Sequence, residues 1–301
     1  MAESVFLAHP KQSGNRHGNI HGNIQSIIPD ILIKVLLTVT ALAVLLPMLF
    51  MITASFMPVM EIRKMPYRWI PSHIAWSNFY RAVAGNDGNF VFIRNVANSL
   101  FVSLSVSFFT VVLSAVTGYG LAKFRFKGRN IVFMAIMMTM MIPFETIMVP
   151  LYMVALNLGL QNTYRGLIVP FLMNAFGVFM MRQYLQTFPD DILDASRIDG
   201  CSEPEIFAKI VMVNSGPALA SLAILTFRQQ WDNLIWPLMI AQQKRLKTVP
   251  TYIVSFAEEK FADEGAMMAV AFLASIPVII LFITLSKYFV MGSAVYSAGK
   301  E

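Results

Sequence analysis

Acidic and basic side chains gather in one segment of an otherwise apolar chain. Between Asp190 and Lys209 stand six acids and two bases, although only 13% of all residues are charged and 56% are hydrophobic. Carboxylates and a guanidinium at this density can form charge-assisted hydrogen bonds with a partner protein. The excess of acids repels phosphate groups, which argues against nucleic-acid binding. A solvated connector between helices is the plainer alternative.

The charged segment, residues 189–213, has the sequence pattern of two short helices that meet at a glycine. Pro189 and the two acids after it are typical of a helix start. Gly200 predicts the end of that helix, because glycine adopts a left-handed conformation without strain. Ser202 and Glu205 form a capping box, which predicts the start of a second helix. We expect the apolar face of the first helix to be Ile192, Ala195 and Ile198, and that of the second to be Ile206, Phe207, Ile210 and Val213.

Glu145 is the one acid within a long apolar stretch between Asn130 and Tyr164. A carboxylate inside a membrane-spanning helix is costly and is therefore a functional candidate. Pro143 and Pro150 flank it, so the alternative is a broken helix whose freed backbone N–H groups the carboxylate caps.

Further candidates for lining a translocation pathway are amide, acidic and aromatic side chains near the ends of apolar runs: Asn174, Trp231, Asp232 and Asn233. Asn174 could equally join two helices by a hydrogen bond. Arg228 and Asp232 are four residues apart, so they could form an ion pair on one helix face. They either line an outward cavity or mark the end of a helix.

Membrane-spanning helices must position all of these side chains. The mean hydropathy is +0.61, and long runs such as Val35–Met60 and Asn95–Ala122 carry no charge. Since a helix needs about 20 apolar residues to cross a bilayer, the sequence predicts an all-α polytopic membrane protein with six spans. We expect the spans near residues 31–57, 96–122, 131–157, 164–182, 211–235 and 266–290, with the third and fifth interrupted.

Residues 1–30 differ from the rest of the chain. They are polar and rich in Gly, Asn and His, and they lack the apolar core of a cleaved signal peptide. We expect a disordered cytoplasmic tail at 1–30 and a transmembrane domain at 31–301. No cluster of residues has metal-ligand spacing, so we expect neither a metal nor a cofactor.

The loop Lys123–Arg129 carries four bases and no acid. Short basic loops usually face the cytoplasm, so we expect this loop, both termini and the charged segment on the cytoplasmic side. The basic residues of the first loop, Arg63, Lys64, Arg68, Arg81 and Arg94, then face outward.

The spacing of the charged segment resembles the cytoplasmic coupling loop of ABC importer permeases. That loop reads Glu-Ala-Ala, three residues, Gly, nine residues, Ile, one residue, Leu-Pro; here the matching positions are Asp194-Ala195-Ser196, Gly200, Ile210 and Met212-Val213. The segments 118–129, 142–170, 231–241 and 247–250 also resemble this family, closest to its carbohydrate branch of the maltose-permease G-subunit type. The Asp, Ser, Met and Val depart from the family pattern.

The resemblance implies an inner-membrane permease subunit that performs no catalysis itself. The sequence has no G-x-x-x-x-G-K-[ST] phosphate loop, so ATP and Mg²⁺ would be bound by two partner ATPase subunits. The resemblance also implies a homologous second permease subunit and an extracytoplasmic binding protein. The residues implied in coupling to the ATPase are Asp194, Ala195, Ser196, Arg197, Asp199, Gly200, Glu205, Phe207 and Ile210.

The substrate implied is a sugar or oligosaccharide moved by alternating access, and the basic outward loop would suit an acidic one such as a uronate oligosaccharide. The alternative hypothesis is an ion-coupled secondary transporter in which Glu145 relays a proton. That hypothesis leaves the spacing of the charged segment without a role.

Overall fold

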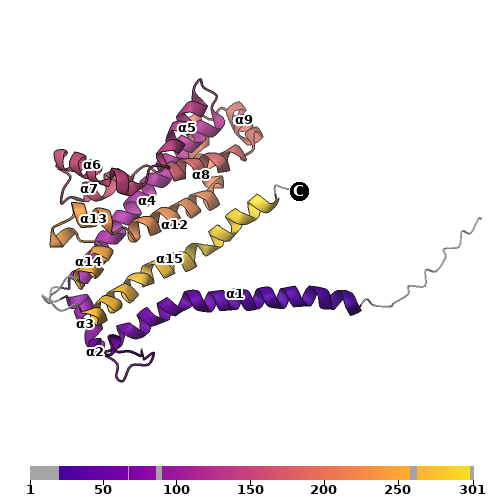
Figure 1. The fold of residues 1–301 in the computed structure, drawn as a ribbon. Coiled ribbons are helices and arrows are strands. Elements are labelled where there is room, and N and C mark those ends of the chain that lie inside the picture. The colour runs from indigo at the N-terminus through magenta and orange to yellow at the C-terminus, as the bar shows by residue number, and fades with distance from the viewer. Residues whose placement is uncertain (1–19, 67, 86–89, 258–262, 299–301) are drawn as a thin grey trace, which may run out of the picture. The chain divides into compact units, whose positions relative to one another are not determined.

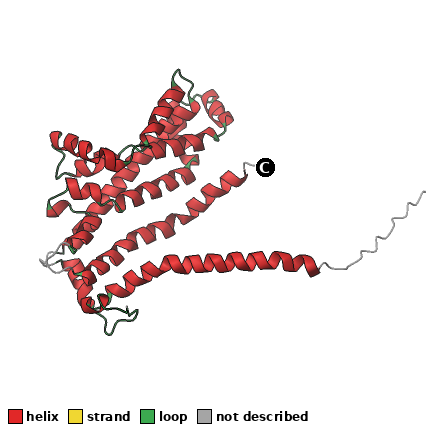
Figure 2. Cartoon of the chain, in the orientation of Figure 1, coloured by secondary structure: helices red, strands yellow, loops and turns green. Residues whose placement is uncertain are grey.

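The computed structural model of the protein describes residues 20–66, 68–85, 90–257 and 263–298, and side chains between 31 and 284 within those ranges. All regular secondary structure in these ranges is helical (Figure 2). The chain divides into two compact units, Met1–Phe50 and Met51–Glu301. The first unit contains most of helix α1 (Ile20–Ser55), whose side chains from residue 31 are apolar and largely exposed. Of the expected tail, residues 1–19 lie outside the described ranges.

The second unit begins with the end of α1 and continues through helices of very different length. The long ones are α4 (Val91–Lys123) and α15 (Glu264–Ala298). The shorter ones are α2 (Val59–Ile62), α3 (Trp76–Ala84), α5 (Arg129–Thr139), α6 (Phe144–Asn157), α7 (Tyr164–Ile168), η1 (Val169–Phe171), α8 (Ala175–Gln186), α9 (Asp190–Ile198), α10 (Glu203–Glu205), η2 (Ile206–Val211), α11 (Met212–Asn214), α12 (Gly216–Trp231), α13 (Ile235–Ile240), η3 (Lys244–Leu246) and α14 (Val249–Ser255).

The six expected spans correspond to three single helices and three bent pairs. Ile31–Ser55, Val91–Lys123 and Glu264–Thr284 are long and apolar enough to cross a membrane. The pairs α5 with α6, Tyr164–Phe171 with α8, and Glu203–Asn214 with α12 pass the same test together but bend by 95°, 44° and 78°. The predicted all-α polytopic membrane fold is confirmed.

The breaks in the spans agree only in part with the sequence analysis. The expected interruption of the third span is confirmed, since α5 ends before Pro143 and α6 starts after it. The fourth span was expected to be continuous, but it breaks before Asn174, which caps α8 through its side chain. The fifth span bends at Ser215, because Pro217 stands in the first turn of a new helix, and that helix, α12, ends at Trp231.

Helix α4 forms the centre of the second unit, where it packs along α8 and α12 (Figure 1). Small residues on α4 permit this close approach. A Cβ atom added at Gly118 would lie 2.8 Å from the Cβ of Met181 on α8. Helix α12 also packs on α15, and α15 packs on α3. The elements that carry the two groups of candidate residues are therefore joined through α4.

Candidate functional site

The charged segment folds as two short helices, as the sequence predicts. Helix α9 begins after Pro189 with two acids in its first turn, and Gly200 follows with φ +84°. The capping box is confirmed: the Ser202 backbone N–H donates to the Glu205 carboxylate at 3.0 Å, and the Ser202 hydroxyl donates to it at 2.8 Å. Helix α9 lies at the same end of the second unit as the start of α5 (Figure 1).

The buried face of α9 differs from the expected one. Leu193 and Ser196 are buried against the molecule, and the Ser196 hydroxyl donates to the Ile192 carbonyl at 2.6 Å. The expected face, Ile192, Ala195 and Ile198, points outward instead, with Ile198 86% exposed. That expectation was wrong because a single leucine on the opposite face fills the apolar cluster formed by α4, α8 and α12. Ser196 is thus buried, whereas Ala195 is exposed.

The second helix of the segment is partly a π-helix, which shifts its buried face. Ile206 and Val211 are buried, Phe207 and Ile210 pack beside them, and Val213 is 70% exposed. We expected Val213 on the buried face, counting 3.6 residues per turn. The wider turn of η2 brings Val211 inward in its place, which corrects the expectation.

Arg197 joins the two helices of the segment. Its guanidinium donates to Asp194 at 2.6 Å and to Glu203 at 2.7 Å, across the turn at Gly200. Glu203 also accepts a hydrogen bond at 3.0 Å from the hydroxyl of Tyr119, near the end of α4. These bonds hold the turn closed and attach it to the central helix.

A second attachment comes from Lys123, the last residue of α4. Its ammonium group donates to the Phe188 carbonyl and to the Asp190 carboxylate, both at 2.6 Å. The sequence analysis missed both Tyr119 and Lys123 as partners of the segment. Lys123 stands in a conspicuous basic loop, but nothing in the sequence marks Tyr119.

The ion pairs and the capping hydrogen bonds keep the acids of the segment charged well below neutral pH. The hydrogen bond and positive charge of Lys123 lower the pKa of Asp190. The Ser202 backbone N–H, with Lys209, lowers the pKa of Glu205 to about 2. Hydrogen bonds to Glu203 and Asp194 raise the pKa of Arg197 further above its already high value. Asp199, also proposed for coupling, is exposed.

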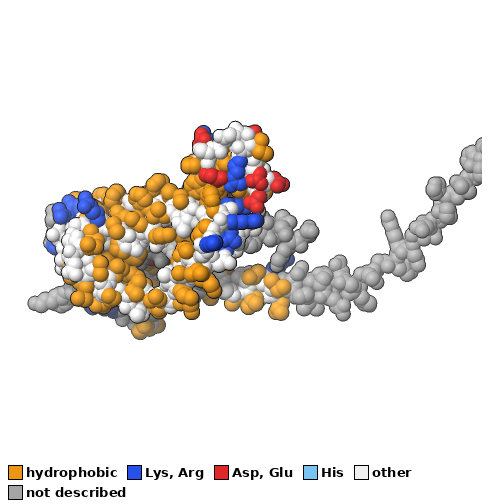
Figure 3. All heavy atoms as spheres, turned by 90° about the horizontal axis from the view of Figure 1, so that it is seen from above, with side chains coloured by type: hydrophobic (Ala, Val, Ile, Leu, Met, Phe, Trp, Pro, Cys, Tyr) orange, Lys and Arg blue, Asp and Glu red, His pale blue; other side chains and the backbone are white. Residues whose placement is uncertain are grey.

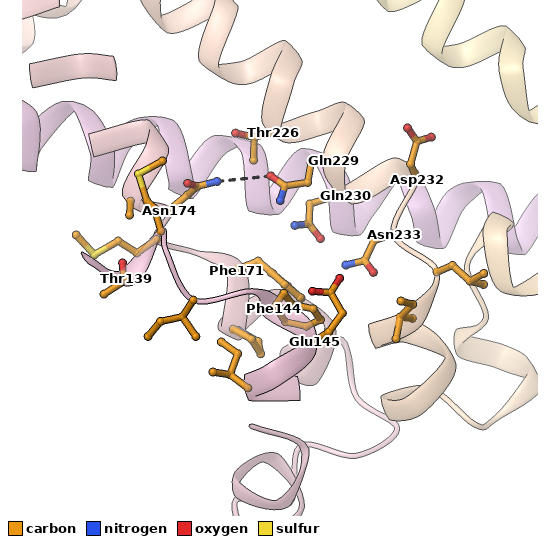
Figure 4. A pocket seen from close by; sticks show the side chains of 18 residues that line it. Thr139, Phe144, Glu145, Phe171, Asn174, Thr226, Gln229, Gln230, Asp232 and Asn233 are labelled. Atoms are coloured by element: carbon orange, nitrogen blue, oxygen red, sulfur yellow. Dashed lines mark hydrogen bonds between the residues drawn. The ribbon is translucent and has the colours of Figure 1, made fainter. Parts of the chain in front are cut away.

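A separate cavity of about 700 Å³ lies at the breaks of the third and fourth spans and at the end of α12. It is lined by residues 139–147, at the turn from α5 to α6, by residues 170–175, before and at the start of α8, and by residues 226–235, at the end of α12. Figure 4 shows Glu145, Gln230 and Asn233 pointing toward one another across it. Two span breaks and the end of α12 therefore bring polar side chains together.

Four of the five predicted pathway residues line this cavity: Glu145, Asn174, Asp232 and Asn233. Trp231 does not. It is buried with its ring stacked on Phe227, and its indole N–H donates to the Ala274 carbonyl on α15 at 3.2 Å. It therefore packs α12 on α15. The sequence analysis missed Thr139, Phe144, Phe171, Thr226, Gln229 and Gln230, which stand on the same turns.

The polar contacts in the cavity are few. The Asn174 side chain accepts a hydrogen bond from the Phe176 N–H at 2.8 Å, and its amide lies 3.5 Å from the Gln229 side-chain oxygen. Arg228 pairs with Asp232 at 3.5 Å, as the four-residue spacing predicts. Asn174 both caps α8 and links it to α12. Two carboxylates and several amides thus line the cavity, and the described lining contains no base.

Comparison with known proteins decides between the hypotheses. Residues 110–292 match the family model described as "Binding-protein-dependent transport system inner membrane component", more than half of the chain. The chain belongs to this family. The resemblance to ABC importer permeases is thereby confirmed, and the protein is an inner-membrane component.

Curated relatives are permease subunits as well. The chain is 33% identical over 257 residues to the arabinooligosaccharides transport system permease protein AraQ of Halalkalibacterium halodurans, covering 85% of this chain and 91% of that one. It is 32% identical over 195 residues to the lactose transport system permease protein LacG of Rhizobium radiobacter, covering 65% and 71%. It is 29% identical to the sn-glycerol-3-phosphate transport system permease protein UgpE of Yersinia pestis, covering 83% and 91%.

The fold is that of a permease whose structure has been solved. A chain in the crystal structure of a bacterial ABC transporter involved in the import of the acidic polysaccharide alginate matches with a TM-score of 0.76. The match covers 88% of this chain and 98% of that chain at 23% identity.

Proposed function

We propose that the protein is one of two permease subunits of an ATP-driven importer for an oligosaccharide, and that residues 189–213 couple it to an ATPase. The observation that carries the proposal is the outward face of α9. Ile192, Ala195 and Ile198 present an apolar strip at the end of a membrane-spanning unit, while the ion pairs of Arg197 hold the turn rigid. Apolar side chains exposed in this way are suited to a protein partner.

The two attachments of the segment suggest how a movement of the ATPases would be transmitted to the cavity. Lys123 fixes the start of α9 to the end of α4, and Tyr119 fixes the turn to the same helix. Helix α4 packs on α8 and α12, whose ends line the cavity. When the ATPases close on ATP, displacement of α9 would move these helices as a body and switch the cavity between the two sides of the membrane.

The remaining partners follow from the family. A homologous permease would close the other side of the pathway, two ATPase subunits would bind ATP and Mg²⁺, and an extracytoplasmic binding protein would deliver the substrate. The chain itself would bind no cofactor. The orientation we propose places residues 123–129 and 189–213, with both termini, in the cytoplasm.

The lining of the cavity bears on the substrate. Amides such as Asn233 and Gln229 can exchange hydrogen bonds with hydroxyl groups, and Phe144 and Phe171 offer flat apolar surfaces to sugar rings. The carboxylates of Glu145 and Asp232 would repel the carboxylate of a uronate. The described lining residues include no Lys or Arg that would offset this repulsion. We therefore favour a neutral oligosaccharide over the acidic one that the outward basic loop suggested.

The test is uptake and ATPase retention by the assembled importer. Ile198→Asp adds a charge to the outward face without touching the molecule's own core, so we expect ATPase to be lost from the purified complex and uptake to stop. Ile198→Val is the matched control and should retain both. The same assay tests the substrate by comparing the uptake of a neutral arabino-oligosaccharide with that of a uronate oligosaccharide. Normal ATPase retention and uptake by the Asp variant would contradict the proposed coupling.

A further inference from the structure

The short loop between α4 and α5 encloses a second cavity that the transport function does not use. It has a volume of about 370 Å³ and is lined by Arg125, Phe126, Gly128, Arg129, Asn130 and Ile131. The loop connects the candidate span Val91–Lys123 with the bent span that begins at Arg129. The cavity therefore lies where the chain enters and leaves the membrane.

The bases of this loop are largely unpaired. Lys123 is held by Asp190, whose charge also acts on Arg125 at longer range, but Arg125 and Lys127 make no ion pair among the described residues. Among the described residues, the Arg129 guanidinium donates only to the Phe124 carbonyl, at 3.3 Å. Two guanidinium groups therefore border one cavity without a carboxylate in direct contact. This arrangement is suited to an anion with several acceptor oxygens, such as a phosphate.

A further guanidinium lies behind the loop. Arg182 on α8 is buried, stands 3.9 Å from the ring centre of Phe133 on α5, and has no partner for its Nε atom. Its charge adds to the positive potential on this side of α5. Figure 3 shows red and blue side chains together at one end of the second unit, a separate blue group at the opposite end, and hydrophobic side chains over much of the surface between them.

Apolar side chains adjoin the basic cavity directly. Phe126 is 47% exposed, Ile131 is 74% exposed, and Met134 one turn further along α5 is 60% exposed. A ligand that fits both features carries an anionic headgroup and an acyl chain. A free phosphate would contact only the basic side chains. An acidic protein surface would also contact only these bases, and the apolar side chains of α5 would remain exposed to the membrane.

We propose that Arg125, Arg129 and the adjoining face of α5 bind the phosphate headgroup of an anionic membrane lipid. The two guanidinium groups hold the phosphate oxygens, and Ile131 and Met134 lie along the acyl chain. Basic pockets beside membrane helices commonly recognise anionic lipids in this way. Because the site adjoins Lys123, which anchors α9, the bound lipid would stabilise the end of α4 to which the coupling segment is attached.

The experiment is native mass spectrometry of the assembled importer in mild detergent, titrated with phosphatidylglycerol, phosphatidylcholine or inorganic phosphate. We expect phosphatidylglycerol to form the retained adduct. Each base contributes on the order of fivefold to such binding, so Arg125→Gln should weaken it about fivefold and the double variant with Arg129→Gln about 25-fold. Arg125 makes no hydrogen bond within the described residues, so the single variant is expected to fold normally.

Arg165→Gln is the matched control, because Arg165 is an exposed arginine without an ion pair in the described ranges and lies on a different element, helix α7. It should bind phosphatidylglycerol as the parent does. Equal retention of phosphatidylcholine, an equal loss of phosphatidylglycerol in Arg165→Gln, or retention of inorganic phosphate alone would overturn the proposal. Loss of the ATPase from Arg125→Gln with lipid binding unchanged would show that the loop binds a protein instead.

Discussion

At the scale of single residues, Lys123 is the best-defined link between the membrane helices and the charged segment, residues 189–213. Its ammonium group is almost fully buried, whereas its partner Asp190 is 74% exposed. Asp191 stands at the same helix start and shares the favourable interaction with the helix dipole, but it makes no ion pair among the described residues. Comparison of these two neighbouring acids therefore isolates the contribution of the ion pair.

We predict that Asp190→Asn lowers the unfolding temperature at neutral pH more than Asp191→Asn does. The pKa of Asp190 is lowered in the folded protein, so its stabilising contribution is complete above the ordinary aspartate value of about 3.9. That contribution is lost as the pH falls through the lower folded-state pKa. Thermal unfolding in detergent between neutral and strongly acidic pH checks this. A difference between the variants that persists at the lowest pH would refute the assignment.

Glu145 tests the ion-coupled alternative at the same scale. Its carboxylate makes no hydrogen bond within the described residues and faces the cavity (Figure 4). We predict that Glu145→Gln leaves ATP-driven uptake largely intact, because the amide can still exchange hydrogen bonds with a sugar. A proton relay would stop with this change. Uptake in proteoliposomes with and without ATP and a pH gradient separates the two outcomes.

At the scale of helices, the sequence was informative where local rules decide the structure. The helix start at Pro189, the turn at Gly200 and the capping box at Ser202 are all present, since each depends on a few neighbouring residues. The buried faces were predicted less well. One reason is that η2 has a wider turn than an α-helix. As a result Val211 is buried, whereas we expected Val213 to be buried.

The cavity shows that prediction from sequence is equally limited for residues that lie far apart in the chain. Glu145, Asn174 and Asp232 were marked individually by their polarity, but only the packing of three bent spans brings them together. The neighbouring Gln229 and Gln230 carried no separate signal, because glutamine near the end of a helix is ordinary. Trp231 was misplaced because the sequence does not show which way α12 turns its aromatic side chains.

The packing of α4 on α8 gives a prediction at this scale. In Gly118→Ala, the new methyl group would lie 2.8 Å from the Met181 Cβ and 2.9 Å from the Arg182 backbone nitrogen. We expect a loss of about 1–3 kcal/mol in stability from overpacking. Gly120→Ala is the matched control, since nothing lies within 4 Å of its added atom. It should be neutral or gain up to about 1 kcal/mol. Equal thermal unfolding of the two variants would contradict the proposed close packing.

At the scale of the whole molecule, the second unit carries its two functional features on one connected set of helices. The coupling segment is attached to α4, and α4 packs on α8 and α12, whose ends border the cavity. Membership in the binding-protein-dependent permease family supplies the reason for such a connection. In the proposed mechanism, a displacement of α9 would reach the cavity through α4, α8 and α12, because these helices pack on one another.

The most direct test of this account is photo-crosslinking from position 198 in the assembled importer. A benzoylphenylalanine in place of Ile198 would stand on the outward face of α9, and we predict a covalent adduct with the mass of an ATPase subunit. The same group in place of Ile131, on the exposed face of α5, serves as the control and should not label the ATPase. Failure of position 198 to label the ATPase while the importer remains active would contradict the central claim.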